Sequence, residues 1–444
     1  MTPLSGVTRA SGWSDRPRWA MIVALVACLA ALALRLHRLA EPLMRWDEGW
    51  SVAHASRSVG EVIRIASWEV HPPLFYLLLK PWLALGRAVF VVRAFPVLVG
   101  CLAVPLAYQV ARQWTGRRSL ACVAAGLAAV APALVYYGQV TRMYSLVAFW
   151  LLLATWALLR WLARGTRGAL AVLALATVAA LYTLYYTAFP LLGLYLYGLV
   201  TARQRRRWLV AAGALALLLY LPWVIVAAPG MLARMAEAAP TETIMPVTAW
   251  GLVRSVWTAL TFDLSAGGWA ALAVLVVLDA AACSHRPARA EACRLLLPLL
   301  TLISATVGIA LASGTYFFAP RLFIPAVPFL LLLVAWALDG LARRSAWLLV
   351  AGLAALVITY CPTSSHLVYE KNLEVSGPFN PHEYHALLSG QAAAEDLVVF
   401  NELALAGWYE LDRGPADPPW HYALRWTPII EPMPAMMVEK ATPN

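Results

Sequence analysis

Two adjacent acids flanked by tryptophans are the sequence feature best suited to chemistry. Asp47 and Glu48 lie between Trp46 and Trp50, in a polar stretch that interrupts long apolar blocks. A carboxylate can accept the proton of an attacking hydroxyl, and aromatic faces pack on sugar rings, so the group suits a reaction on a carbohydrate. Two plainer interpretations also fit, because adjacent loop acids are usually solvated and an Asp before a helix is often its N-cap.

Two arginines stand out because membrane topology does not explain them. Arg142 and Arg321 lie in short connections that otherwise carry almost no positive charge. An arginine kept at such a helix end often has an anionic partner, such as a phosphate or a carboxylate. Alternatively, each side chain extends to the lipid headgroups, and the sequence leaves both interpretations open.

Three more residues are weaker candidates for contact with a substrate. His71 precedes a Pro-Pro pair, which fixes the chain as extended. The histidine either orients the loop or donates a hydrogen bond to a substrate, and the residue pattern favours the first role. Lys80 and Tyr137 are secondary candidates for binding an anion. No cluster of His, Asp and Glu has firm metal-ligand spacing, and we expect no obligatory divalent metal.

The elements that carry these residues are expected to be transmembrane helices. The chain has 444 residues, of which 62% are hydrophobic and only 13% are charged, whereas soluble domains have about 25% charged residues. Most apolar blocks approach the ~20 residues that cross a bilayer, and only helices satisfy a single segment's backbone in lipid. These blocks include Trp19–Leu36, Leu120–Val135, Met143–Leu162, Ala169–Tyr186, Trp208–Ala228, Trp269–Cys283, Leu295–Ala312, Leu322–Leu338 and Ala346–Tyr360. We predict an all-α polytopic membrane protein with about eleven transmembrane helices.

The net charge of +11 is interpreted as a topology signal and not as a nucleic-acid footprint. Most loop arginines fall in alternate connections, which the positive-inside rule places in the cytoplasm. This puts the N-terminus inside and the C-terminus outside, with Asp47, Arg142 and Arg321 on one external face. The six cysteines show no disulfide framework or metal-ligand pair and are interpreted as small buried residues.

The first external loop, at about residues 40–88, is expected to contain helices that do not span the membrane. An amphipathic helical run is predicted from Val52 to Trp68. The short apolar run Leu74–Leu85 contains Lys80 and is predicted to lie flat at the outer surface, as is Val247–Phe262.

Two regions are predicted along the chain. Residues 1–362 form the transmembrane domain, and residues 363–444 form a small extracytoplasmic α/β appendage. Within the appendage, Asp396–Phe400 is predicted to be a buried strand and Ala404–Leu411 a short helix.

Five short segments make the sequence recognisable. They are Trp46–Gly49, His71–Tyr76, Arg93–Pro96, Tyr136–Tyr144 and Pro320–Pro328. Their order along the chain, and the loops in which they lie, resemble those of glycosyltransferase family 39. This family includes bacterial protein O-mannosyltransferases and aminoarabinose lipid A transferases. The resemblance implies a GT-C-type membrane fold in the bacterial inner membrane.

The resemblance also implies a reaction and roles for individual residues. The reaction is an inverting transfer of a hexosyl or pentosyl group from a polyprenyl-phosphate sugar on the extracytoplasmic face. The first-loop acid, here Asp47 with Glu48 beside it, is implied as the catalytic base. The residues implied to bind the donor phosphate are Arg142 and Arg321, with Lys80 and Tyr137 as additional candidates; those assigned to the substrate are Trp46, Trp50, His71 and Tyr144.

The expected partners are membrane lipids, the lipid-linked donor, and an acceptor glycan, lipid or protein, without nucleic acid or a cofactor. One position departs from the family. Many relatives carry an acid after the Gln of the second external loop, where this chain has Val140. The change indicates a different acceptor, a different hydrogen-bonding partner or a weakened enzyme.

A transporter, a flippase or a polysaccharide polymerase is the alternative class. Transporters often show internal repeats, broken helices and charges at mid-membrane depth. The sequence has no convincing repeat, and its notable charges lie at external helix ends. The acidic first loop favours the transferase over a polymerase.

Overall fold

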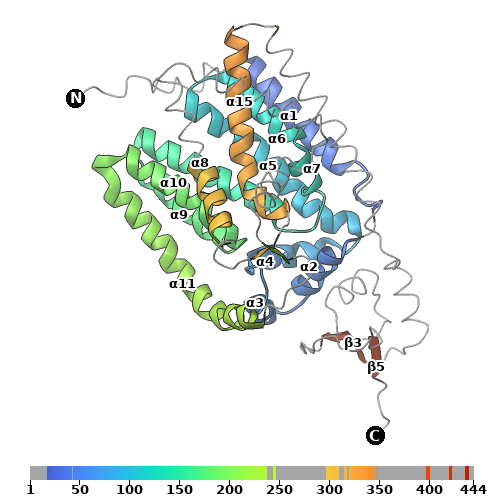
Figure 1. Ribbon diagram of the computed structural model, residues 1–444. Coiled ribbons are helices and arrows are strands. Elements are labelled where there is room, and N and C mark those ends of the chain that lie inside the picture. Colours follow the sequence, from blue (N-terminus) through green and yellow to red (C-terminus); the bar gives the residue numbers. More distant parts are fainter. Residues whose placement is uncertain are drawn as a thin grey trace.

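The computed structural model describes residues 18–42, 44–237, 244–246, 297–309, 315–317, 320–344, 347, 397–400, 420–422 and 436–439. In this part the chain is a bundle of apolar helices, with several short helices gathered at one end (Figure 1). Five of the described helices include a stretch long and apolar enough to cross a membrane. They are α1 (Arg18–Leu36), α5 (Val89–Thr115), α8 (Tyr144–Arg164), α11 (Arg206–Glu237) and α15 (Val327–Arg344). The helical membrane fold is thus confirmed, and the count of eleven stays a prediction.

Shorter apolar helices complete the described bundle. They are α6 (Arg118–Val130), α7 (Pro132–Tyr136), α9 (Arg167–Leu181), α10 (Ala188–Thr201) and the helix Leu297–Ile309. Three 3-10 turns, η3 (Tyr185–Thr187), η4 (Arg203–Arg205) and η5 (Pro320–Ala326), connect longer elements.

The centre of the bundle is α5, which packs against α1, α6 and α8. Its buried positions include small residues such as Gly100 and Ala103, which let neighbouring helices approach closely. At one end of the bundle, Asp339 of α15 accepts a hydrogen bond from Ser119 Oγ at 2.7 Å and pairs with Arg117. These contacts join the start of α6 to the end of α15.

The first long loop forms three short helices, α2 (Trp46–Ser56), α3 (Val59–Ser67) and α4 (Leu74–Trp82), followed by the 3-10 turn η2 (Leu83–Leu85). The prediction of one helical run from Val52 to Trp68 is wrong, because α2 ends at Ser56. Ser58 starts a new helix: its Oγ accepts from the Glu61 backbone N–H, and Glu61 Oε2 accepts from the Ser58 N–H at 3.1 Å. This capping box stabilises the start of α3.

The second apolar run of the first loop is helical and too short to span a bilayer, as predicted. Phe75, Tyr76 and Leu79 of α4 are buried, and α4 packs against α2. Its placement flat at the membrane surface stays a prediction. The other segment predicted to lie flat, Val247–Phe262, is outside the described residues.

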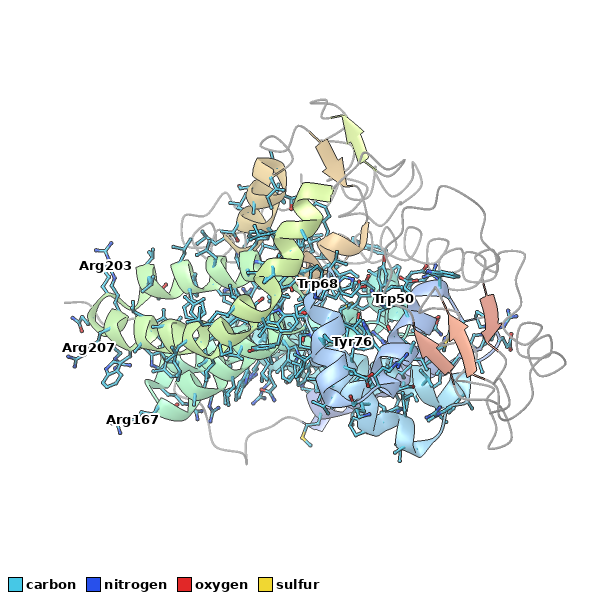
Figure 2. All side chains as sticks on the ribbon, turned by 90° about the horizontal axis from the view of Figure 1, so that it is seen from below. Trp50, Trp68, Tyr76, Arg167, Arg203 and Arg207 are labelled. Atoms are coloured by element: carbon cyan, nitrogen blue, oxygen red, sulfur yellow. The ribbon has the colours of Figure 1, made fainter. Side chains whose placement is uncertain are left out.

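The labelled arginines of two turns lie away from the first-loop helices. Figure 2 shows Arg167, Arg203 and Arg207 at one edge of the bundle, far from Trp50 and Tyr76. This separation agrees with the alternation of charge along the sequence.

Short strands occur outside the bundle. β1 (Ile244–Pro246) pairs antiparallel with β2 (Thr315–Phe317). A second sheet has the order β4 (Trp420–Tyr422), β3 (Leu397–Phe400) and β5 (Met436–Glu439), with β3 parallel to β4 and antiparallel to β5. β3 confirms the predicted strand near Phe400, whereas the predicted helix Ala404–Leu411 lies outside the described residues.

Candidate active site

Asp47 and Glu48 begin α2 and face different surroundings. Successive residues of an α-helix are rotated by about 100°, so adjacent acids cannot share one face. The Asp47 side chain is 34% exposed, whereas that of Glu48 is fully buried. Of the two carboxylates, Asp47 is therefore the one that a substrate can reach.

Glu48 is held by α5 and by two backbone groups. Arg93 donates from Nε to Oε1 at 2.9 Å and from Nη2 to Oε2 at 2.7 Å. The backbone N–H groups of Arg45 and Thr141 donate to the same carboxylate at 3.0 and 2.8 Å. Burial alone would raise the pKa of Glu48, but the charge and hydrogen bonds of Arg93 and the backbone donors outweigh it and hold the pKa below its usual value.

These contacts correct the assignment of Glu48 to the catalytic pair. Both of its oxygens are engaged, and the ionised carboxylate is closed off from a substrate. Glu48 instead joins α2 to α5 and to the turn that carries Arg142. Through these contacts Glu48 fixes the start of α2, the helix that also carries Asp47.

Arg142 lies against the first two turns of α2. Its Nη1 donates to the Asp47 backbone oxygen at 3.1 Å and to Ser51 Oγ at 3.2 Å. Its Nε lies 4.0 Å from Asp47 Oδ2, and the residue is only 5% exposed. The structure therefore brings Asp47 and Arg142 together, as a site on one external face requires.

The turn before Arg142 is fixed from the opposite side by α1. Gln139 Nε2 donates to the backbone oxygens of Leu34, Arg35 and His37 at 3.3, 3.2 and 3.0 Å. These are carbonyls at the end of α1, which have no partner within the helix. With Thr141 bound to Glu48, the turn has anchors on two helices.

Arg35 makes the reciprocal contact at the end of α6. It is fully buried, and it donates to the carbonyls of Ala129 at 2.9 Å and Ala128 at 3.2 Å. A cation at a helix C-terminus also opposes the negative end of the helix dipole. Gly138 leaves room for this side chain, because a Cβ there would lie 3.0 Å from Arg35 Nε.

The aromatic candidates have unequal access. Trp46 is 45% exposed and can stack on a sugar ring. Trp50 is half-buried, and its ring meets that of His54 edge-on at 6.0 Å between centroids. Tyr137 and Tyr144 contact each other at 4.7 Å between centroids, next to Arg142 in the chain.

The remaining predicted site residues are placed differently. Lys80 Nζ donates to the Arg57 backbone oxygen at 2.6 Å, roughly 15 Å along α2 from Asp47. His71 is half-buried ahead of α4, where Pro73 is the N-cap position. The Arg321 backbone belongs to η5, and its side chain is outside the described residues.

Several residues around Asp47 were not selected from the sequence. Ser51 and His54 follow Asp47 at the fourth and seventh positions, so they share its face of α2, and this spacing is a usable sequence signal. Arg93 lies in a recognised segment, but its pairing with Glu48 spans 45 residues and no local pattern predicts it. In the sequence, Arg35 is an ordinary charged residue at the end of a transmembrane helix, and nothing in its neighbourhood predicts its contact with α6.

In the described part of the chain, no three His, Cys, Asp or Glu side chains are grouped so that they could hold a metal ion. A reaction without an obligatory metal stays a prediction.

Comparisons with known proteins bear on the fold and the family. Residues 70–226 match the family model of dolichyl-phosphate-mannose-protein mannosyltransferases. That range includes α4 and Arg142, and it begins after Asp47. None of the curated proteins matches the sequence.

Two solved structures have a similar fold. ArnT from Cupriavidus metallidurans bound to undecaprenyl phosphate matches with a TM-score of 0.56 and 16% identity, over 93% of this chain and 86% of that chain. The Archaeoglobus fulgidus oligosaccharyltransferase tethered to an acceptor peptide matches with a TM-score of 0.51 and 13% identity, over 86% of this chain and 58% of that chain. The family match covers residues 70–226, and the two similar structures show that the chain shares their membrane fold.

Proposed function

We propose that the protein transfers a hexosyl or pentosyl group from a polyprenyl-phosphate donor to an acceptor hydroxyl, with inversion and with Asp47 as the base. The observation that carries the proposal is the pairing of a partly exposed carboxylate with a buried guanidinium. Asp47 Oδ2 and Arg142 Nε are 4.0 Å apart, and Arg142 also donates to the Asp47 backbone oxygen. The neighbouring residues Thr141 and Glu48 are hydrogen-bonded to each other. The reaction needs one group of each charge.

The proposed step is a single displacement at the anomeric carbon. The acceptor oxygen attacks that carbon while Asp47 takes the hydroxyl proton. The bond from the anomeric carbon to the phosphate oxygen breaks, and its electron pair leaves with the polyprenyl phosphate. Arg142 stabilises the charge that develops on this leaving group, because a fixed cation in a partly dry site acts strongly.

The lipid-linked donor is supported by the chemistry of the similar structures. ArnT was solved with undecaprenyl phosphate, and the family model is named for a dolichyl-phosphate sugar. The acceptor is a lipid, a glycan or a protein, and no metal or other cofactor takes part. Arg321 is proposed as a second cation for the donor phosphate, and Trp46, Trp50, His71 and Tyr144 as substrate contacts.

The proposed membrane is the bacterial inner membrane, with the site on the extracytoplasmic side. Support comes from the position of Arg167, Arg203 and Arg207 at one edge of the bundle, away from Trp50 (Figure 2). Arginine-rich turns favour the cytoplasm. The N-terminus is accordingly proposed to be cytoplasmic and the C-terminus extracytoplasmic.

Transfer from a labelled lipid donor tests the proposal. The purified protein is reconstituted in liposomes with polyprenyl-phosphate mannose or aminoarabinose and an envelope extract as acceptor. We expect Asp47→Asn to insert normally and to lower transfer at least about a hundredfold, because it removes a general base. Glu41→Gln is the matched control, since Glu41 is an exposed acid of the same loop that pairs with Arg38.

Two results would reject this function. One is transfer by Asp47→Asn at the rate of the wild type. The other is movement of the intact lipid across the bilayer without transfer, which would favour the transporter or flippase class.

A further inference from the structure

Two turns of the bundle gather arginines at one edge of the molecule. One turn lies between α8 and α9, and the other lies between α10 and α11. Arg206 of the second turn donates to the Leu199 backbone oxygen at 2.8 Å and so serves the end of α10. The other arginines of the two turns are exposed and form the basic cluster: Arg164, Arg167, Arg203, Arg205 and Arg207. Figure 2 shows three of them, Arg167, Arg203 and Arg207, at this edge.

Close packing brings the two turns together. Gly165 follows α8 with a φ of 67°, and a Cβ built on it would overlap the guanidinium of Arg205. The helices beside the turns approach just as closely. A Cβ on Gly198 of α10 would lie 3.0 Å from Leu158 Cδ1 of α8 and 2.5 Å from Leu209 Cδ2 of α11. The arginines of both turns therefore share one surface.

No acid in this half of the chain balances the cluster. The sequence has no Asp or Glu between Glu69 and Glu237, a stretch that includes α8, α9 and α10. In the described part of the chain, none of the ion pairs includes an arginine of the cluster. Like charges held together repel, and a cation in the first turn of a helix, such as Arg167 in α9, also opposes the helix dipole. An anion from outside the chain would relieve both effects.

Membrane topology explains the arginines only in part. The positive-inside rule acts through the number of arginines and lysines in each loop. It does not require two loops to meet, or the guanidinium of Arg205 to lie against Gly165. The shared surface is therefore a feature of the folded structure beyond the topology signal.

Exposed apolar residues beside the cluster indicate that its partner is a lipid. The ring of Trp208 is 5.5 Å from the Arg207 guanidinium, and the residue is 46% exposed. Val200 of α10 and Val210 of α11 are 62% and 56% exposed. Tryptophan is enriched at the membrane interface, where headgroups meet acyl chains. A lipid contacts both the arginines and these apolar residues, whereas an acidic soluble protein would leave the apolar residues uncovered.

We propose that the basic cluster binds an anionic phospholipid whose headgroup carries two phosphodiesters, with one phosphate at each turn. The two turns supply two groups of guanidiniums, and a guanidinium binds phosphate through two parallel hydrogen bonds. Basic surfaces between transmembrane helices are suited to such headgroups. The bound lipid links α8 and α9 to α10 and α11. This inference does not depend on glycosyl transfer, because the cluster lies away from Trp50 and Tyr76 (Figure 2).

Binding of cardiolipin to the purified full-length protein in detergent, measured by native mass spectrometry, tests the proposal. Cardiolipin carries two phosphodiesters, phosphatidylglycerol carries one, and phosphatidylcholine has no net charge. We expect cardiolipin to bind at least about tenfold more tightly than phosphatidylglycerol, and phosphatidylcholine to show no saturable binding. Equal affinities for cardiolipin and phosphatidylglycerol would overturn the site for two phosphates.

A double variant removes one arginine from each turn. Arg167→Gln/Arg203→Gln should weaken cardiolipin binding roughly thirtyfold, about fivefold for each arginine. Arg167→Lys/Arg203→Lys keeps both charges and should lose no more than about threefold, because lysine also binds phosphate but without the planar fork. The lysine variant also preserves the charge that directs membrane insertion. Wild-type affinity in Arg167→Gln/Arg203→Gln would show that the cluster is not the site.

The matched control removes the same charge elsewhere. Arg112→Gln/Arg118→Gln changes the end of α5 and the start of α6 and should alter cardiolipin affinity less than about twofold. Equal weakening in the two glutamine variants would mean that the arginines attract lipid only through net charge, and the proposed site would be wrong. Thermal unfolding without lipid verifies that each variant is folded.

The same proteins distinguish a lipid from an acidic protein partner. If cardiolipin shows no saturable binding, while a polyglutamate peptide binds the wild type and not Arg167→Gln/Arg203→Gln, the cluster is a protein-docking surface and the lipid proposal fails. Neither result bears on the transferase proposal, whose measurement is the transfer of sugar.

Discussion

The carboxylate of Glu48 and the guanidinium of Arg93 form a bidentate ion pair whose side chains are 0% and 4% exposed. The pair joins the first turn of α2 to α5. Arg93 Nη1 also donates to the backbone oxygens of Leu39 at 2.9 Å and Pro42 at 2.8 Å. One arginine therefore organises the start of the first loop and the helix that presents Asp47.

The first prediction concerns the stability that this pair contributes. Glu48→Gln leaves the Arg93 charge buried without an opposite charge, and breaking such a pair costs about 3–5 kcal/mol. We expect a clear fall in Tm for the detergent-solubilised protein. Glu41→Gln removes an exposed acid of the same loop and should cost less than about 1 kcal/mol. Equal Tm values for the two variants would show that the pair does not stabilise the fold.

The second prediction concerns acid. The folded state holds the pKa of Glu48 below its usual value, so the unfolded chain takes up its proton first as the pH falls. Its contribution is fully present above the ordinary glutamate pKa of about 4.3 and is lost as the pH falls through the folded-state value.

Comparing two variants isolates this titration from those of the other acids. The Tm difference between the wild type and Glu48→Gln is measured from pH 7 downward. We expect a constant difference at neutral pH that shrinks below about pH 4.3. A difference that grows in acid would contradict the assigned direction of the pKa shift.

The third prediction concerns the close packing of the turn before Arg142. In Gly138→Ala, the new Cβ would lie 2.6 Å from the Leu134 backbone oxygen and 3.0 Å from Arg35 Nε. Overpacking of this kind costs about 1–3 kcal/mol, and we expect a lower Tm and slower transfer because the turn carries Arg142.

Gly126→Ala is the matched control for that variant. Gly126 lies within α6, and nothing is within 4 Å of a Cβ built there. Alanine in a helix interior is about 0.5–1 kcal/mol better than glycine, so this variant should be unchanged or slightly more stable. A larger loss in Gly126→Ala than in Gly138→Ala would contradict the packing around Arg35.

The helical architecture could be predicted because it depends on local or additive properties. A block such as Met143–Leu162 is helical in lipid whatever its neighbours are, and the structure has α8 there. The break between α2 and α3 was missed, although Ser58 and Glu61 form a recognisable capping box. The apolar residues recur at helical spacing on both sides of the break, and this periodicity predicted one continuous helix despite the capping box.

The site was predictable only in its outline. The sequence identified Asp47 and Arg142 by residue type and by their positions outside the membrane helices, and the structure places them 4.0 Å apart. Lys80 was a lesser candidate for binding the same anion. Its hydrogen bond to the Arg57 backbone oxygen instead satisfies a group at the end of α2.

Residue types along the chain predict apolar helices and an acid at the start of one loop helix. Which of the two adjacent acids is open depends on how the helices pack in three dimensions. Asp47 and Glu48 have the same charge and nearly the same position in the chain, but a helix turns them apart. Glu48 meets Arg93 and the Thr141 N–H, which lie 45 and 93 residues away, and Asp47 is left beside Arg142 at the surface of the site. Contacts over such separations depend on how the helices pack, and no local pattern encodes them.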